Sequence, residues 1–310
     1  MGIPKLNRFL LEKCNDAITK KHLSELSGEK IAIDTSIYLY KYIGQDKLIE
    51  NFYLMIQIFK YYKITPIFIF DGKPHPEKKE LINMRKISKQ EAEMQYNEIK
   101  SRLENNDISD IDKNEINLQL IKLKKQFIRP KKTDISNIKS LIIHSGLQYC
   151  EANGEADELC ASMILNNQVD ACMSDDMDLF VYGCNKIYRY LSLLNHDIIS
   201  YDMNIILQKL NISLDEFKQI MVLSGTDYNI HQKISINQSM NYYNEYKKSS
   251  KECCFFDWLS DKNIINDNND IYNAYMLFNI NCNNSVNCFH SKENKNNLIK
   301  FLKPHGFIFI

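Results

Sequence analysis

Two short apolar segments that each end directly in an aspartate constrain the fold of this chain more than any other feature. Ile31–Ile33 and Pro66–Phe70 are rich in branched and aromatic side chains, and Asp34 and Asp71 follow them. This composition predicts two buried strands. Residues 48–59 between them carry apolar side chains at helical spacing, and the order strand, helix, strand favours a right-handed crossover. The sequence therefore predicts an α/β fold with a mainly parallel sheet.

The same alternation continues along the chain and then stops in two places. It predicts further helices at 134–144, 155–165, 202–210 and 214–223, and further strands at 147–150, 169–173, 186–190 and 198–201. Residues 77–128 are charged and helix-prone, contain no glycine and are broken only around 105–111, which predicts a helical cap outside the sheet. From residue 229 the chain is rich in asparagine, and only patches at 255–259 and 298–302 predict helices.

Composition excludes several classes of protein. With 44% hydrophobic and 25% charged residues the chain is typical of a globular protein. No run of about eighteen apolar residues occurs, and the charged start of the chain lacks a secretory cleavage pattern. We therefore expect no membrane association and an intracellular location; the sequence does not determine the compartment, and the nucleus and a viral replication compartment are both open. Nine irregularly spaced cysteines predict reduced thiols rather than disulfides.

Charge is informative only locally, because 39 basic and 39 acidic residues cancel. Residues 73–132 carry fifteen Lys or Arg against ten Asp or Glu. Residues 151–180 carry eight carboxylates and no basic residue. A charge run is usually a solvated face, but a basic cap would also draw a polyanionic substrate to a carboxylate-rich pocket.

Carboxylates follow several of the predicted strands. The C-terminal ends of parallel strands converge at one sheet edge, where ligands bind, and Asp34, Asp71 and residues 174–178 all lie there. On an extended segment Asp176 and Asp178 share a face. Each of these residues alone could be a cap or a turn residue. Together their repulsion requires protons or cations, and oxygen ligands without His or Cys favour Mg²⁺ or Mn²⁺. Two such ions about 4 Å apart are used for phosphodiester hydrolysis.

Six motifs in this order resemble the flap endonuclease or XPG-like family of structure-specific 5′ nucleases. They are Met1–Leu6, Ile31–Ser36, Phe70–Pro74, Gly154–Asp157, Asp175–Asp178 and Ser224–Tyr228. The resemblance covers roughly residues 1–228 and implies a PIN-like 5′-nuclease fold, with helices flanking a mainly parallel sheet. It implies an N-terminal nuclease region at 1–85, a helical cap or arch at 86–132, an internal nuclease region at 133–228, and a divergent helical C-terminal region with a degenerate helix-two-turn-helix at 229–310.

The resemblance also implies a hydrolase that uses two Mg²⁺ ions, which Mn²⁺ can replace, and forms no covalent intermediate. By position, the implied ligands of one ion are Asp34, Asp71, Glu155 and Asp157, and those of the other are Asp176, Asp178 and Asp227. Asp157 stands where the family usually has Glu. Glu158 is the alternative ligand, because it shares a helical face with Glu155.

Basic and aromatic residues of the family's DNA-binding surface have counterparts here as well. Lys78 and Arg85, about two helical turns apart, match the pair that steers the scissile phosphate. Tyr40 matches an aromatic residue that stacks on a nucleobase beside the cut. Solvated surface charge and core packing are the respective alternatives. We expect five basic residues of the cap to line a route for single-stranded DNA, unless they are plain surface charge: Lys124, Lys125, Arg129, Lys131 and Lys132.

The predicted function is a metal-dependent structure-specific 5′ endo/exonuclease that cleaves flap or branched DNA during replication or repair. Residues 229–234 lack the glycines of the family's duplex-binding turn, and 307–310 lack the tail that engages a sliding clamp. We therefore expect no duplex binding at 229–234 and no dependence on a clamp. The expected partner is DNA with a 5′ flap, branch or end, and the expected state is a monomer. The alternatives are a 5′-3′ exoribonuclease and an inactive nucleic-acid-binding scaffold, although all seven acids are present.

Overall fold

Five neighbouring strands at the centre of the computed structural model run parallel, and antiparallel strands flank them on both sides. The structure describes residues 2–105, 110–232, 234–249, 253–265, 268–280 and 286–309. The sheet order is β1-β7-β6-β5-β2-β3-β4-β8. The strands are β1 (Ile18–His22), β2 (Lys30–Asp34), β3 (Thr65–Phe70), β4 (Gln148–Glu151), β5 (Ala171–Met173), β6 (Lys186–Ser192), β7 (Asp197–Asp202) and β8 (Asn287–His290). The prediction of a mainly parallel sheet is confirmed.

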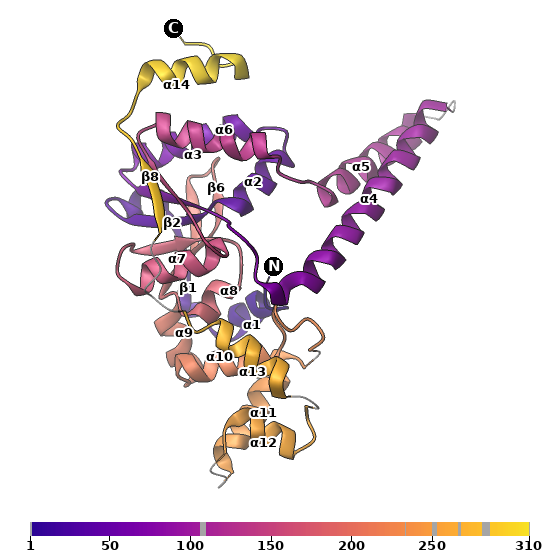
Figure 1. Cartoon of the computed structure of the whole chain (residues 1–310), viewed down its shortest axis with the longest axis vertical. Coiled ribbons are helices and arrows are strands. Elements are labelled where there is room, and N and C mark those ends of the chain that lie inside the picture. The colour runs from indigo at the N-terminus through magenta and orange to yellow at the C-terminus, as the bar shows by residue number, and fades with distance from the viewer. Residues whose placement is uncertain are drawn as a thin grey trace.

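The central strands are buried on both faces because successive side chains point to opposite sides of the sheet. In β2, Ile31 and Ile33 join one hydrophobic layer, whereas Ala32 joins the other. Helices cover both layers (Figure 1). One layer holds α2 (Thr35–Ile43), α3 (Leu48–Tyr61), α6 (Lys132–His144) and α14 (Lys295–Leu302). The other holds α1 (Leu6–Lys13), α7 (Ala156–Leu165), α8 (Asp178–Tyr182), α9 (Met203–Leu210) and α10 (Leu214–Leu223).

The C-terminal region returns to the sheet after a group of helices. Helices α11 (Ile236–Lys248), α12 (Phe255–Asp261) and α13 (Asn268–Leu277) gather at the end of the molecule opposite α14 (Figure 1). Strand β8 then pairs with β4, and α14 packs on α6. The region predicted to be helical from residue 229 therefore also supplies an edge strand. Lys233 of the expected turn at 229–234 lies outside the described residues.

A disulfide corrects the cysteine prediction. Cys150 of β4 lies directly opposite Cys288 of β8 in the antiparallel register, and the two form a disulfide with Cα atoms 4.1 Å apart. The expectation that no disulfide holds this fold is wrong, because the pairing depends on a strand that the sequence pattern did not reveal. Six other cysteines are free, and Cys282 lies outside the described residues.

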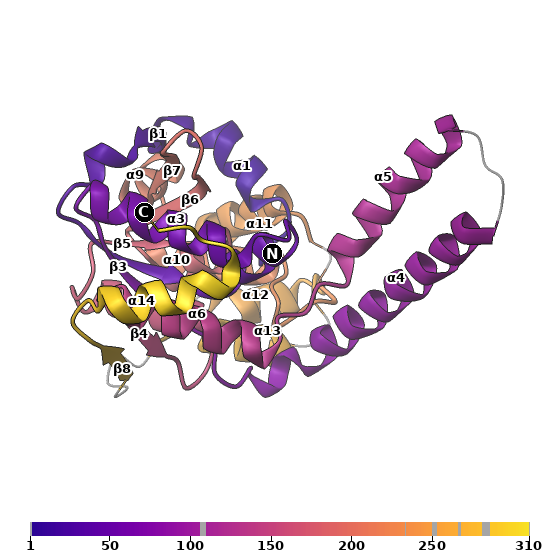
Figure 2. The same ribbon diagram turned by 90° about the horizontal axis from the view of Figure 1, so that it is seen from above.

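The predicted cap is a pair of helices that projects away from the sheet (Figures 1 and 2). We call α4 (Lys79–Asn105) and α5 (Asp110–Gln126) the arm. The helices pack through a narrow seam with Ala92 and Leu123 buried, whereas Ile87 and Met94 are exposed. Most of the break predicted at 105–111 falls outside the described residues. Within the described part of the chain, no helix is both long and apolar enough to cross a membrane.

Candidate active site

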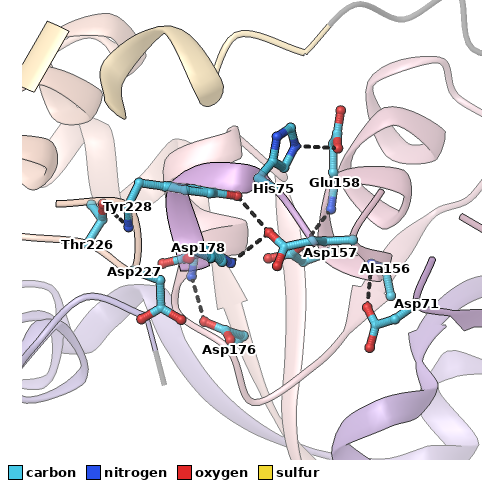
Figure 3. A network of polar contacts seen from close by, with 12 residues as sticks. Asp71, His75, Ala156, Asp157, Glu158, Asp176, Asp178, Thr226, Asp227 and Tyr228 are labelled. Atoms are coloured by element: carbon cyan, nitrogen blue, oxygen red, sulfur yellow. Dashed lines mark hydrogen bonds and ion pairs between the residues drawn. The ribbon is translucent and has the colours of Figure 1, made fainter. Parts of the chain in front are cut away.

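The seven acidic residues singled out in the sequence lie at the C-terminal edge of the parallel strands, and five of them are labelled in Figure 3. Asp34 ends β2, and Asp71 follows β3. Glu155 and Asp157 lie at the start of α7, and Asp227 follows α10. Asp176 follows β5, and Asp178 begins α8. Residues almost two hundred positions apart therefore meet because parallel strands end on one edge.

Hydrogen bonds from hydroxyl and amide groups hold the side chains of Asp34 and Asp71 in place. Asp34 caps α2 by accepting a hydrogen bond from the Ser36 amide (3.1 Å), and its other oxygen accepts one from Ser174 Oγ (2.9 Å). Asp71 accepts hydrogen bonds from Ser36 Oγ and from the Ala156 amide, the latter at 2.8 Å. These bonds connect the ends of β2, β3 and β5 to the start of α7. Burial, followed by the charges of neighbouring Asp71 and Asp176, raises the pKa of Asp34 to about 7.

Asp176 and Asp178 form the most enclosed part of the site. The Asp178 amide donates to Asp176 Oδ1 (3.1 Å), and the Asp178 side chain is completely buried. Neither Asp178 carboxylate oxygen has a hydrogen-bond partner among the described residues. Gly2 lies so close that a Cβ atom there would clash with Asp178 Oδ1. Burial, followed by the charge of Asp176, raises the pKa of Asp178 well above its ordinary value.

Lys78 is buried inside the acidic cluster. Its Nζ lies 2.7 Å from Oε2 of Glu155, and the residue is only 6% exposed. It belongs to a 3₁₀ turn at Pro76–Lys78 rather than to α4. Because Lys78 is buried, the alternative of a solvated lysine is wrong. Burial disfavours the ammonium form, but the carboxylates of Asp157, Asp178 and Glu155 outweigh it and raise the pKa of Lys78. Lys78 therefore carries a positive charge among the carboxylates.

The structure separates Asp157 from Glu158. Asp157 is buried at the cluster, and its pKa is raised well above normal, first by burial, although Lys78 opposes the shift. The charges of Glu155 and Asp176 also raise it. Glu158 instead contacts His75, with Oε2 3.4 Å from Nε2 (Figure 3). The arrangement therefore places the oxygens of Asp157, and not those of Glu158, with the other acids.

Arg85 and Tyr40 border the acidic cluster. The Arg85 guanidinium lies 2.8 Å from Oδ2 of Asp227 while its side chain stays 44% exposed. Tyr40 is 42% exposed, and Lys89 Nζ lies 4.7 Å from the centroid of its ring. Because Tyr40 is exposed, unlike the buried Tyr38 on the same helix, the core-packing alternative does not apply to Tyr40. Both Arg85 and Tyr40 can therefore be reached by a large ligand.

The five basic residues predicted along the cap are exposed near the place where the arm rejoins α6. Lys124 pairs with Asp46 (2.8 Å) and Arg129 with Glu93 (3.3 Å). The remaining three are Lys125, Lys131 and Lys132. Contact of these residues with DNA stays a prediction.

Several residues of the site were not predicted from the sequence. Tyr228 donates a hydrogen bond to Glu155, and Ser36 and Ser174 hold Asp71 and Asp34. Each stands within or directly beside a motif that carries a predicted ligand. Their position in the sequence could have marked them as neighbours of the acids, but not as hydrogen-bond partners.

The residues present fit a bound divalent cation. The cluster offers carboxylate oxygens, the donors that Mg²⁺ prefers, and both buried oxygens of Asp178 lack a partner in the described structure. Raised pKa values at Asp34, Asp157, Asp176 and Asp178 reflect burial together with mutual repulsion. Among the described residues, no three such side chains are already spaced as the ligands of one ion. Lys78 supplies compensating charge in this arrangement.

Comparisons with known proteins identify the same two segments. The XPG N-terminal domain model matches residues 1–92, and the XPG I-region model matches residues 146–227. Flap endonuclease 1 of Methanococcus aeolicus is 30% identical over 235 residues, which cover 70% of this chain and 68% of that protein. A probable RAD2-like endonuclease of Invertebrate iridescent virus 6 is 27% identical over 283 residues, covering 74% and 67%.

A solved structure shows the same fold. The catalytic core of Rad2, solved in complex with a DNA substrate, superposes with a TM-score of 0.65 at 22% identity, and the match covers 98% of this chain and 94% of that one. The curated relatives are longer, and this chain spans 57% to 68% of the length of eight of them.

Proposed function

Because this chain belongs to the flap endonuclease or XPG-like family, we propose that it is a metal-dependent structure-specific 5′ nuclease that hydrolyses phosphodiester bonds in flap or branched DNA. The observation that carries this proposal is the meeting of seven acidic residues at one edge of the sheet, with Lys78 buried beside Glu155, Asp157 and Asp178. A scaffold without catalytic activity has no need of such a costly group of buried charges.

The acids would hold two Mg²⁺ ions, with Mn²⁺ as a substitute. The residues proposed for one ion are Asp34, Asp71, Glu155 and Asp157, and those for the other are Asp176, Asp178 and Asp227. Bound Mg²⁺ supplies Lewis-acid stabilisation of the negative charge on phosphate oxygens. Loss of any one acid would remove a proposed ligand and so weaken this stabilisation.

Basic residues would bring the phosphate to the acids. Lys78 and Arg85 each contact an acid of the cluster, and each can exchange that carboxylate for a phosphate oxygen of the substrate. This exchange would orient the scissile bond. Orientation and charge stabilisation provide most of the catalysis in phosphate hydrolysis that forms no covalent intermediate. The exposed Tyr40 ring would stack on a base beside the cut.

Partner and location are proposals as well. We propose a monomer that acts inside the cell. The charged side chains of Lys20 and Lys21 on edge strand β1 support the monomer, since charges on an edge oppose pairing with a second sheet.

The experiment that tests the function compares purified protein on flap, gapped, nicked and single-stranded DNA and RNA, with Mg²⁺ or EDTA. We expect Mg²⁺-dependent cleavage of 5′-flap DNA, abolished in Asp176→Ala while DNA binding stays measurable. Asp175→Ala is the matched control, because the Asp175 carboxylate instead accepts a hydrogen bond from the Tyr190 amide (2.8 Å). Unchanged turnover in Asp176→Ala would refute the site, and cleavage of RNA alone would favour the exoribonuclease alternative.

A further inference from the structure

We propose that Tyr228 is a positioning residue that fixes Glu155 and Lys78 in a common geometry. This inference rests on the proposed function, because it concerns how the same site is prepared for a cation and a phosphate. Tyr228 directly follows Asp227 in the loop after α10. Its hydroxyl contacts Glu155, and its ring contacts the buried ammonium group of Lys78.

The hydroxyl sets the orientation of the Glu155 carboxylate. Tyr228 donates to Oε2 of Glu155 at 2.8 Å, and Lys78 Nζ lies 2.7 Å from the same oxygen. Two donors on one oxygen hold the carboxylate plane in place. The other oxygen, Oε1, takes part in no hydrogen bond or ion pair between residues of the described structure. Glu155 is thereby left with one oxygen available to a cation.

The ring holds Lys78 from the other side. Lys78 Nζ lies 4.5 Å from the centroid of the Tyr228 ring, within the range of a cation–π interaction. When a phosphate or a metal ion changes the charge around Glu155, the ring face still favours an ammonium group at this place. One side chain therefore positions both an expected ligand and the lysine expected to contact the phosphate.

Tyr228 itself is held by two independent supports. The hydroxyl of buried Tyr182 lies 2.9 Å from that of Tyr228, and because Tyr228 donates its proton to Glu155, Tyr182 is the donor. The Tyr228 amide donates to Thr226 Oγ1 (3.1 Å), and the Asn229 side chain accepts from the Thr226 amide (2.7 Å). The loop therefore presents Tyr228 in a fixed orientation, and α8 supports it through Tyr182.

The test measures Mg²⁺ binding by titration calorimetry on the full chain, together with the Mg²⁺ dependence of flap cleavage. Loss of a hydrogen bond to a metal ligand typically costs 10–100-fold in metal affinity or activity. We expect Tyr228→Phe to weaken Mg²⁺ binding and lower kcat by about tenfold each, with KM for DNA nearly unchanged. Tyr228→Leu, which also removes the ring from Lys78, should lower kcat further.

Two matched variants separate positioning from general loss of structure. Tyr182→Phe keeps the bond between Tyr228 and Glu155 and should change Mg²⁺ binding much less. Tyr246→Phe removes a comparable hydroxyl bond, to the Cys253 carbonyl (2.8 Å), and should change neither Mg²⁺ binding nor kcat. Near-ultraviolet circular dichroism checks the folding of each variant, and the ring retained in Tyr228→Phe keeps its packing against Phe278.

The outcomes distinguish this inference from the proposed function. Mg²⁺ binding by Tyr228→Phe equal to that of the unaltered chain overturns the role of Tyr228. A chain that binds Mg²⁺ but cleaves no DNA overturns the proposed function, while the calorimetric comparison still decides the role of Tyr228. Equal weakening of Mg²⁺ binding in Tyr228→Phe and Tyr246→Phe would also contradict positioning, because it would reflect general loss of structure.

Discussion

The ammonium nitrogen of Lys78 lies 2.7 Å from Oε2 of Glu155, in surroundings that leave only 8% and 16% of the two side chains exposed. Burying such an ion pair costs desolvation free energy, and removing one of the two partners destabilises the protein further. Because Asp157 and Asp178 also act on Lys78, its charge balances several acids at once. Lys78 therefore stabilises the folded protein, in addition to its proposed contact with the substrate phosphate.

Replacing Lys78 should destabilise the metal-free protein. We expect Lys78→Met to lower the free energy of unfolding in EDTA by about 3 kcal/mol, since it leaves buried carboxylates without their counter-charge. Lys79→Met is the control, because the neighbouring Lys79 is exposed and should be replaceable without loss. Chemical denaturation monitored by circular dichroism measures both. Equal stability of the two variants would contradict the role of Lys78 as counter-charge.

Stabilisation by Mg²⁺ should depend on pH. The pKa of Asp34 is raised to about 7 in the folded protein and is about 4 in an unfolded chain. The folded state therefore binds its proton more tightly, and without metal the free energy of unfolding falls as pH rises from about 4 to about 7. We expect Mg²⁺ to raise the unfolding temperature more at pH 8 than at pH 5.5, where protons compete. A gain that is the same at both pH values would argue against a cation among these acids.

Asp157 and Glu158 should differ sharply in function. Asp157 is buried among the acids, whereas Glu158 contacts His75. We expect Asp157→Ala to reduce kcat by roughly 100-fold or more, since loss of a group that only supports a metal ligand already costs about 10–100-fold. Glu158→Ala should reduce kcat by less than about threefold, because Glu158 lies away from the acids. Single-turnover cleavage of a 5′ flap measures both. The reverse ranking would assign the ligand to Glu158.

The disulfide between β4 and β8 should contribute to stability. It closes a separation of 138 residues, and removal of such a bond typically costs roughly 2–4 kcal/mol. We expect Cys288→Ser to lose stability in this range, and a dithiol reductant to destabilise the unaltered chain by the same amount. Cys254→Ser should not matter, since Cys254 is an exposed free thiol. If reductant affected the unaltered chain and Cys288→Ser alike, another bond would be responsible.

Much of the fold could be predicted from local sequence. The apolar composition of two segments, Ile31–Ile33 and Pro66–Phe70, predicts that they are buried strands, and Asp34 and Asp71 mark where these strands end. Parallel strands then place the acids on one edge without further information. The helices of the arm could also be predicted, because a long charged segment without glycine favours a helix.

What could not be predicted depends on contacts between distant residues. Strand β8 has only Cys288 and Phe289 as apolar residues, so its pairing with β4 leaves no periodic signal. Burial of Lys78 depends on acids that lie up to 100 positions away, including Asp178. The bond from Tyr228 to Glu155 spans 73 positions, and a tyrosine in a turn motif does not reveal its partner.

The arm has a consequence for how the molecule behaves in solution. Helix α4 has 27 residues and so extends about 40 Å, about twice the radius of gyration of roughly 20 Å expected for a compact chain of this length. A single copy should therefore elute from a gel-filtration column ahead of spherical standards of equal mass, as though it were larger. Molar mass from light scattering, rather than elution volume, will tell one copy from two.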